Sequence, residues 1–275
     1  NVPKEMHFKY IQEAGGTLNG STSTDRTNYY EKLPSNNLEV ALWLESDRMG
    51  YFLPALTQEK LDNQKDVVRN ERLERYDNQP YGLAWEILNK NVYPENHPYS
   101  WITIGHLKDI ESYTLYDVKH FFQTYYSPNN ASIVVAGDIN KEKTIDLINK
   151  YFGEINSFKV DSHPQRHSVK LKNNVYVEHV DDVQLERLYL SWPSDFIFGK
   201  DDASLEICSD ILSGSKNSRL HKKLVFDLQI AQDVTSFQYS GKFGGQFIII
   251  STIKPGQDTN KIKQLILDEI NEIAT

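Results

Sequence analysis

The sequence has little cysteine and no long hydrophobic run. Cys208 is the only cysteine among 275 residues, which excludes an internal disulfide framework and any metal site built from several cysteines. No stretch of about 18 consecutive apolar residues occurs, so no membrane-spanning helix is predicted. The opening residues, NVPKEMHFKY, lack the charged-then-apolar pattern of a secretory leader. An export signal already removed by processing stays compatible with this pattern.

Excess positive charge is also lacking. The formal net charge is -8, whereas nonspecific nucleic-acid binding needs a basic stripe that displaces phosphate counterions. The composition is that of an ordinary globular protein, with 39% hydrophobic and 12% aromatic residues. A chain of this length buries a full core and is expected to form two domains.

Local patterns predict helices and one hairpin in the first part of the chain. Gly15-Gly16 is expected to end a first helix, and Asp25 to lie in a polar turn between two strands. Gly50 is expected just beyond the end of a second helix. The predicted elements are a helix over 3–14, strands over 17–24 and 28–33, a helix from 35–37 to 49, and a charged helix over 57–75.

The following segment ends in a compact αβα pattern. Apolar spacing predicts a helix over 115–125, a buried strand over 131–136 and a helix over 141–152 that Gly153 ends. Residues 154–170 have linker composition. We therefore expect a first domain over 1–155, a linker over 156–171 and a second domain over 172–275.

The order of elements after the linker partly repeats the order at the start. Strands are predicted over 174–180 and 184–192, followed by helices over 201–212 and 218–228, a hairpin, and a helix over 258–273. Placing Asn217 on Asn1 aligns the helix over 218–228 with that over 3–14, and the strand over 231–240 with that over 17–24. This indicates a duplicated α+β fold. Chance remains an alternative, because strand-strand-helix order is common.

Five segments in this order resemble landmarks of the pitrilysin/insulinase-type zinc peptidases. They are AGGTLNGSTSTDRTNYYE, LEVALWLESDRM, KDVVRNERLER, PYSWITIGHLKDI and FFQTYYSPNNASIVVAGDI, and SGSKNSRLHKKL is similar to the family's second domain. The resemblance implies two homologous domains, each a mostly antiparallel sheet with helices on one face and each incomplete in this chain. Such a pair forms half of a clam-like chamber around unfolded peptides.

The resemblance also implies a zinc site that is incomplete in this sequence. The family holds zinc with an H-x-x-E-H helix and a distant glutamate, and no H-x-x-E-H occurs in residues 1–275. Glu71 takes the distal-ligand position, and Gln64 stands where many relatives carry a supporting glutamate. Without the resemblance, Glu71 reads as a solvated residue paired with Arg75. No catalytic residue is assigned, and this chain alone is predicted to bind no zinc and cleave no peptide.

In the family, the strand after the Gly-Gly turn receives substrate as an added strand. This makes Leu18, Asn19, Gly20 and Ser21 candidates for main-chain contact with a peptide, a mode that tolerates many side chains. The alternative is an internal hairpin strand in which Gly20 marks a bulge. The residues alone do not choose between the two.

Two functions follow from the resemblance. The first is a zinc metalloendopeptidase that acts on unstructured peptides, with residues 1–275 inactive by themselves. The second is a noncatalytic peptide-binding partner or scaffold subunit of such a peptidase. Both imply a peptide ligand and a second peptidase-like subunit or homo-oligomer, with no nucleic acid and no membrane span. The pattern resembles exported bacterial members, so a periplasmic location is expected, with the cytoplasm as the alternative.

Overall fold

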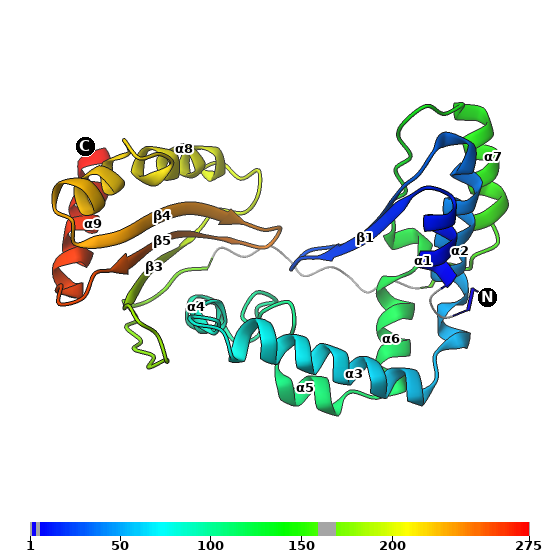
Figure 1. The fold of residues 1–275 in the computed structure, drawn as a ribbon, viewed down its shortest axis with the longest axis horizontal. Helices are drawn as coiled ribbons and strands as arrows, with labels where there is room; N and C mark the ends of the chain where they lie inside the picture. The colour runs from blue at the N-terminus through cyan, green and yellow to red at the C-terminus, as the bar shows by residue number, and fades with distance from the viewer. Residues whose placement is uncertain (1, 4–5, 159–168, 275) are drawn as a thin grey trace. The chain divides into compact units, whose positions relative to one another are not determined.

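A computed structural model describes residues 2–3, 6–158 and 169–274. The chain forms two compact units, residues 1–72 with 103–163 and residues 73–102 with 164–275 (Figure 1). Residues 73–102, which the sequence analysis counts in the first domain, therefore group with the second unit. The duplication of the two domains stays a prediction.

The first unit opens with a helix, a hairpin and a long helix. Helix α1 (Met6–Glu13) ends at Gly15, whose φ of +76° is a conformation that glycine adopts without strain. Strands β1 (Thr17–Thr22) and β2 (Thr27–Lys32) pair antiparallel. A short 3₁₀ turn, Ser35–Asn37, leads into α2 (Leu38–Ala55). The predicted helix and hairpin are confirmed.

Gly50 does not end α2, and the expected helix end at this residue is wrong. The helix continues to Ala55, and Leu56 then turns to an extended conformation. A Cβ atom on Gly50 would lie 3.2 Å from the side chain of Ile155. Glycine is therefore explained at this position by close packing against the segment after α7 and not by a helix end.

Helices make up the rest of the first unit. They are α3 (Gln58–Arg72), α5 (Leu107–Ser112), α6 (Leu115–Tyr125) and α7 (Lys141–Phe152), with a 3₁₀ turn at Pro128–Asn130. Thr114 and Asp117 form a capping box at the start of α6, and Asn140 Oδ1 accepts a hydrogen bond from Lys143 N at the start of α7. The helices predicted over 115–125 and 141–152 are confirmed.

The buried strand predicted over 131–136 is wrong. These residues belong to no strand of the described chain, and Val134 is 88% exposed. The strand predicted over 174–180 is wrong for the same reason, since Val180 is 89% exposed and no described strand pairs with it. An apolar run becomes a buried strand only where a partner supplies ladder hydrogen bonds and cover.

The second unit contains a three-stranded antiparallel sheet in the order β3-β5-β4. Its strands are β3 (Arg187–Ser194), β4 (Ala231–Ser240) and β5 (Gly245–Ile253), with Trp192 opposite Phe247 and Phe237 opposite Ile248. Because side chains alternate along a strand, Phe247 and Ile249 of β5 face one side, and Gln246 and Ile248 face the other. The strands predicted over 184–192 and 231–240 are confirmed.

Helices cover both sides of this sheet. Helices α8 (Asp202–Ser213) and α9 (Thr259–Ala274), with the π-helical turn His221–Asp227, contribute to one core with Phe247 and Ile249 (Figure 1). The opposite side meets α4 (Ala84–Val92) from segment 73–102, where Gln246 Nε2 donates to Asn89 Oδ1 at 2.9 Å. The sequence does not predict the place of segment 73–102 on the second sheet.

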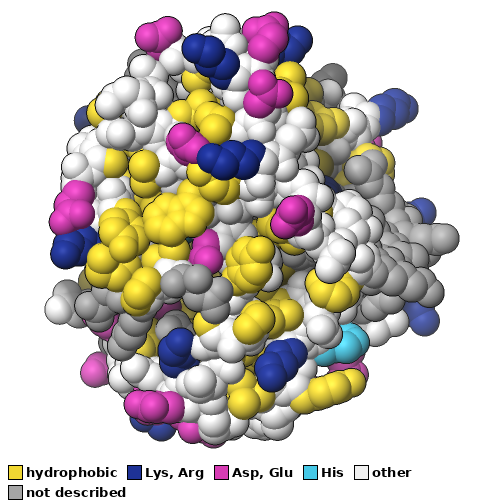
Figure 2. All heavy atoms as spheres, turned by 90° about the vertical axis from the view of Figure 1, so that its right-hand side faces the viewer, with side chains coloured by type: hydrophobic (Ala, Val, Ile, Leu, Met, Phe, Trp, Pro, Cys, Tyr) yellow, Lys and Arg dark blue, Asp and Glu magenta, His cyan; other side chains and the backbone are white. Residues whose placement is uncertain are grey.

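Several large apolar side chains of the first unit are exposed. Trp43, Tyr51, Tyr116 and Phe121 are among them, and Figure 2 shows hydrophobic side chains gathered in patches between acidic and basic ones. No helix of the described residues is both long and apolar enough to cross a bilayer. Most of the predicted linker, residues 159–168, lies outside the described residues.

Candidate functional site

Glu71 lies half-buried in the last turn of α3, next to a buried arginine. Thr57 Oγ1 accepts a hydrogen bond from Lys60 N at the start of this helix. At the other end, Arg72 is 5% exposed and donates from Nη1 to the carbonyl oxygen of Gly105. This hydrogen bond fixes the turn that carries Glu71. Gln64, two turns earlier on the same face, is exposed.

Lys65 ties the middle of the same helix to α5. Its Nζ donates to the carbonyl oxygen of Glu111 at 3.0 Å and lies 4.9 Å from the ring centroid of Tyr113. Side-chain contacts of Lys65 and Arg72 with residues after position 100 therefore hold the part of α3 that carries Gln64 and Glu71.

The described residues around Glu71 do not complete a zinc site by themselves. Residues 2–3, 6–158 and 169–274 contain one group of three His, Cys, Asp or Glu side chains whose ligand atoms lie close together. Its members are His7, Glu31 and Glu45. Among these described residues, neither Glu71 nor a histidine near it belongs to such a group. Zinc needs three or four fixed protein ligands, so the described part of the chain does not complete a site at Glu71.

Strand β1 has one edge that no described strand covers. Its sheet consists of β1 and β2 alone, and Ser23 N donates to Arg26 O at 2.8 Å to close the turn between them. Bonded and non-bonded pairs alternate along an antiparallel ladder. Counting back from the Ser23–Arg26 pair, Gly20 opposite Tyr29 and Leu18 opposite Glu31 are non-bonded pairs. The backbone N–H and C=O groups of Leu18 and Gly20 therefore point to the uncovered edge of β1.

The other two predicted contact residues, Asn19 and Ser21, direct their backbone groups toward β2. Asn19 nevertheless affects the uncovered edge, because its Oδ1 accepts a hydrogen bond from Gly20 N at 2.8 Å. A Cβ atom at Gly20 would lie 3.3 Å from the carbonyl oxygen of Asn28. Glycine at position 20 therefore lets β1 and β2 approach each other closely without a steric clash.

A cluster of ionisable side chains joins α1, β2 and α2. His7 Nε2 lies 2.6 Å from Glu31 Oε1 and 3.9 Å from Glu45 Oε1. Glu45 also accepts hydrogen bonds from Arg48, whose guanidinium carbon lies 3.7 Å from the ring centroid of Tyr29. Sequence reasoning missed this cluster and had no signal for it, because its members lie 24 and 14 residues apart on three different elements.

Tyr29 adjoins this cluster through its contact with Arg48. Partial burial, together with its hydrogen bond to the hydroxyl of Tyr126 at 3.1 Å, holds the pKa of Tyr29 above its usual range. The phenol therefore stays neutral at physiological pH, and its ring offers Arg48 a cation–π contact.

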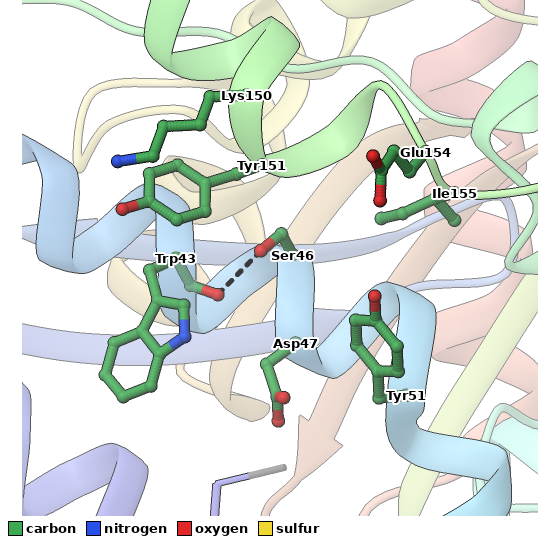
Figure 3. Close-up of a pocket in the computed structure, with 8 residues that line it drawn as sticks. All are labelled: Trp43, Ser46, Asp47, Tyr51, Lys150, Tyr151, Glu154 and Ile155. Atoms are coloured by element: carbon green, nitrogen blue, oxygen red, sulfur yellow. Dashed lines mark hydrogen bonds between the residues drawn. The ribbon is translucent and has the colours of Figure 1, made fainter.

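A pocket of about 320 Å³ lies between α2 and the end of α7 (Figure 3). Trp43, Asp47 and Tyr51 line it from α2, and Lys150 and Tyr151 line it from α7. Lys150 Nζ and the Tyr151 hydroxyl both donate to Glu39 at 2.7 Å. The pocket is open and none of the predicted site residues lines it.

Two solved structures match nearly the whole of this chain. A structure described as a protease from Helicobacter pylori matches 99% of this chain and 65% of its own, with 29% identity and a TM-score of 0.89. A peptidase M16 inactive domain from Pseudomonas fluorescens matches 97% of this chain and 64% of its own, with 18% identity and a TM-score of 0.83, a likeness of fold. The fold is the two-domain α+β fold of these peptidase structures, and this chain corresponds to part of one half.

The chain belongs to peptidase family M16, the pitrilysin/insulinase family. The model described as Insulinase (Peptidase family M16) matches residues 1–102, and that described as Peptidase M16 inactive domain matches residues 112–275. Zinc protease PqqE of Helicobacter pylori is 30% identical over 94% of this chain, and the uncharacterized zinc protease YmxG of Bacillus subtilis is 26% identical over 91%. The chain spans 58% of the length of each.

Proposed function

We propose that this chain is part of a zinc-dependent endopeptidase that hydrolyses unstructured peptides. In this proposal a part of the protein outside residues 1–275 supplies H-x-x-E-H. Its main support is the 30% identity with a zinc protease over 94% of this chain. This match covers 58% of the length of that protease. Because the described residues do not complete a zinc site at Glu71, residues 1–275 alone do not hydrolyse peptide in this proposal.

The uncovered edge of β1 supports the substrate class. Leu18 and Gly20 present backbone N–H and C=O groups there, and an extended peptide pairs with such groups whatever its side chains. A folded domain rarely offers a free strand, so this mode selects unstructured chains. Asn19 and Ser21 contribute by holding β1 on β2, and the side chain of Asn19 competes with the peptide for Gly20 N.

Glu71 is proposed as the distal zinc ligand of the complete protein and Gln64 as a residue that supports it. The support is the position of Glu71 in a turn that Arg72 anchors through Gly105. A ligand carried on an anchored turn loses little side-chain freedom when it binds an ion. Gln64 is neutral, so its contribution is hydrogen bonding and not charge.

A second function is favoured by one observation. Residues 112–275 match the model of the M16 inactive domain, which suits a noncatalytic subunit that binds peptide and assists a catalytic partner. Exposed Trp43, Tyr51 and Phe121 on the first unit supply apolar surface for such a partner or for a second copy. Light scattering of the complete protein would show a dimer or larger assembly if a second copy covers this surface.

The experiment compares the complete protein with residues 1–275 in a quenched fluorescent peptide assay. The endopeptidase proposal predicts cleavage by the complete protein, loss of cleavage with a chelator, and no cleavage by residues 1–275. Peptide binding without cleavage by the complete protein would contradict the endopeptidase and support the scaffold. Absence of both binding and cleavage would reject both proposals.

A periplasmic location is part of the proposal. The structure described as the periplasmic protease PqqL from Escherichia coli matches 92% of this chain at 15% identity, a likeness of fold. Fractionation of cells that express the complete protein checks this location. Recovery of the protein with cytoplasmic markers would contradict it.

A further inference from the structure

The cluster of His7, Glu31 and Glu45 contains a buried carboxylate oxygen with no hydrogen-bond partner. The side chain of Glu31 is 5% exposed. Its Oε1 contacts His7 Nε2 at 2.6 Å, whereas Oε2 is buried and unpaired. A buried acceptor left without a partner costs about 1–3 kcal/mol, and such groups in native proteins often mark a bound ion or water.

The geometry of the cluster suits a metal ion. One ligand atom from each of His7, Glu31 and Glu45 lies within 4.8 Å of the others. Ligand atoms about 2.0–2.2 Å from a tetrahedral ion lie roughly 3.4 Å apart. Small side-chain rotations would therefore bring all three onto one ion, because the elements that carry them are already adjacent.

The charge of the cluster also favours a cation. The cluster and its neighbour Arg48 together hold two carboxylates and one guanidinium. Arg48 contacts Glu45 mainly through Oε2, with Nε at 3.1 Å from Oε2 and 3.3 Å from Oε1, while Oε1 lies 3.9 Å from His7 Nε2. Glu45 can thus bind an ion through Oε1 and keep Arg48 on Oε2. The stacking of Arg48 on Tyr29 holds the guanidinium at 3.7 Å from that ring, so a second contact keeps it in place when Glu45 binds the ion.

We propose that His7, Glu31 and Glu45 bind one divalent transition-metal ion, with zinc as the best fit. An imidazole nitrogen with two carboxylates is a mixed ligand set that zinc accepts, whereas magnesium and calcium favour sites made of oxygen alone. Water completes the coordination. The ion ties α1, β2 and α2 together, so its role is to stabilise the first unit.

This site is separate from the one proposed at Glu71 and does not depend on the proposed function. Glu71 is not a member of the cluster. The cluster also changes one expectation from the sequence. From the sequence, Glu71 is the only candidate ligand, and the chain is expected to bind no zinc. His7, Glu31 and Glu45, which lie far apart in the sequence, provide a site in the folded chain.

The test is zinc binding by tag-free residues 1–275, stripped with a chelator and titrated with zinc sulfate in a calorimeter. We expect one zinc per chain, binding at least tenfold weaker in Glu31→Gln and in Glu45→Gln, and no comparable binding of magnesium. Glu71→Gln and Glu13→Gln should bind zinc like the wild type, since Glu13 lies on α1 in an exposed pair with Lys9.

Two further measurements keep the test decisive. Zinc should raise the urea midpoint of the wild type and leave that of Glu31→Gln unchanged, with circular dichroism confirming that the variant is folded. A His163→Gln/His167→Gln double variant should keep its zinc, which separates the cluster from the H-P-Q-R-H sequence at 163–167. No saturable zinc, zinc retained by both Glu31→Gln and Glu45→Gln, or zinc lost with the double variant would overturn the proposal.

Discussion

Arg72 Nη1 donates a hydrogen bond to the carbonyl oxygen of Gly105, across 33 positions of the chain. The guanidinium is buried, and the residue before it is Glu71. Gly105 has a φ of +77°, a conformation that presents its carbonyl to α3 at little cost because glycine lacks a side chain. The position of Glu71 thus depends on a contact made by its neighbour.

Arg72→Met should destabilise the first unit by about 2 kcal/mol, because it removes the hydrogen bond from a buried charged donor to Gly105 while it keeps most of the apolar stem. Urea unfolding followed by circular dichroism measures this. The matched control is Arg69→Met, one turn earlier, whose exposed pair with Asp66 at 3.3 Å contributes below about 1 kcal/mol. Equal effects of the two substitutions would contradict the anchoring role of Arg72.

Gly20→Pro should weaken binding of an unstructured peptide at least tenfold, because proline removes the N–H that points to the uncovered edge of β1. Gly20→Ala is the matched control. It adds the same Cβ, which meets Asn28 O at 3.3 Å, but it keeps the N–H. Fluorescence anisotropy of a labelled extended peptide with residues 1–275 gives both affinities.

Asn19→Ala should change peptide affinity in the opposite direction. The substitution frees Gly20 N from Asn19 Oδ1, which accepts it at 2.8 Å, so we expect affinity to rise by a few-fold. The same anisotropy titration measures it. If Gly20→Pro and Gly20→Ala bind equally and Asn19→Ala has no effect, peptide does not add to this edge.

Much of the local structure was predictable from the sequence, whereas features that depend on distant partners were not. The hairpin follows from the Gly15-Gly16 stop and the turn at Asp25, and Thr114 and Asn140 supply helix caps that operate within a few residues. The apolar runs at 131–136 and 174–180 look like strands, but pairing is decided elsewhere in the chain. Likewise, nothing local links Gly50 to Ile155.

In the candidate site too, some residues could be predicted from the sequence, whereas contacts between distant residues could not. Glu71 and Gln64 could be singled out because a resemblance over contiguous segments points to them. The contact of His7 with Glu31 depends on how a helix meets a hairpin strand 24 residues away. Neither spacing nor composition encodes that contact, so the cluster became visible only in the structure.

Stability of the second unit should depend on pH through Glu269 on α9. Burial acts to raise the pKa of Glu269, but hydrogen bonds from Lys223 and Arg219 outweigh it and hold the pKa below its ordinary value of 4.5. A carboxyl group with a depressed folded pKa stabilises the fold above the unfolded pKa, and this contribution is lost as pH falls through the folded pKa. Glu269→Gln should therefore cost about 2 kcal/mol near pH 7 and progressively less below about pH 4.5.

Urea unfolding at several pH values measures the difference between wild type and Glu269→Gln. Glu272→Gln is the control on the same helix. It also contacts Arg219, but its side chain is mostly exposed, so its effect should stay below about 1 kcal/mol at every pH. A cost of Glu269→Gln that does not shrink at acidic pH would contradict this account.

The measurement that tests the central claim most directly is zinc content and peptidase activity of the complete protein carrying Glu71→Gln, beside Glu74→Gln. Glu74 follows three residues later and is exposed, so it is a matched carboxylate outside the proposed site. Glu71→Gln should lower bound zinc by one ion per chain and abolish chelator-sensitive cleavage, whereas Glu74→Gln should retain both. Full zinc content and cleavage after Glu71→Gln would contradict the account.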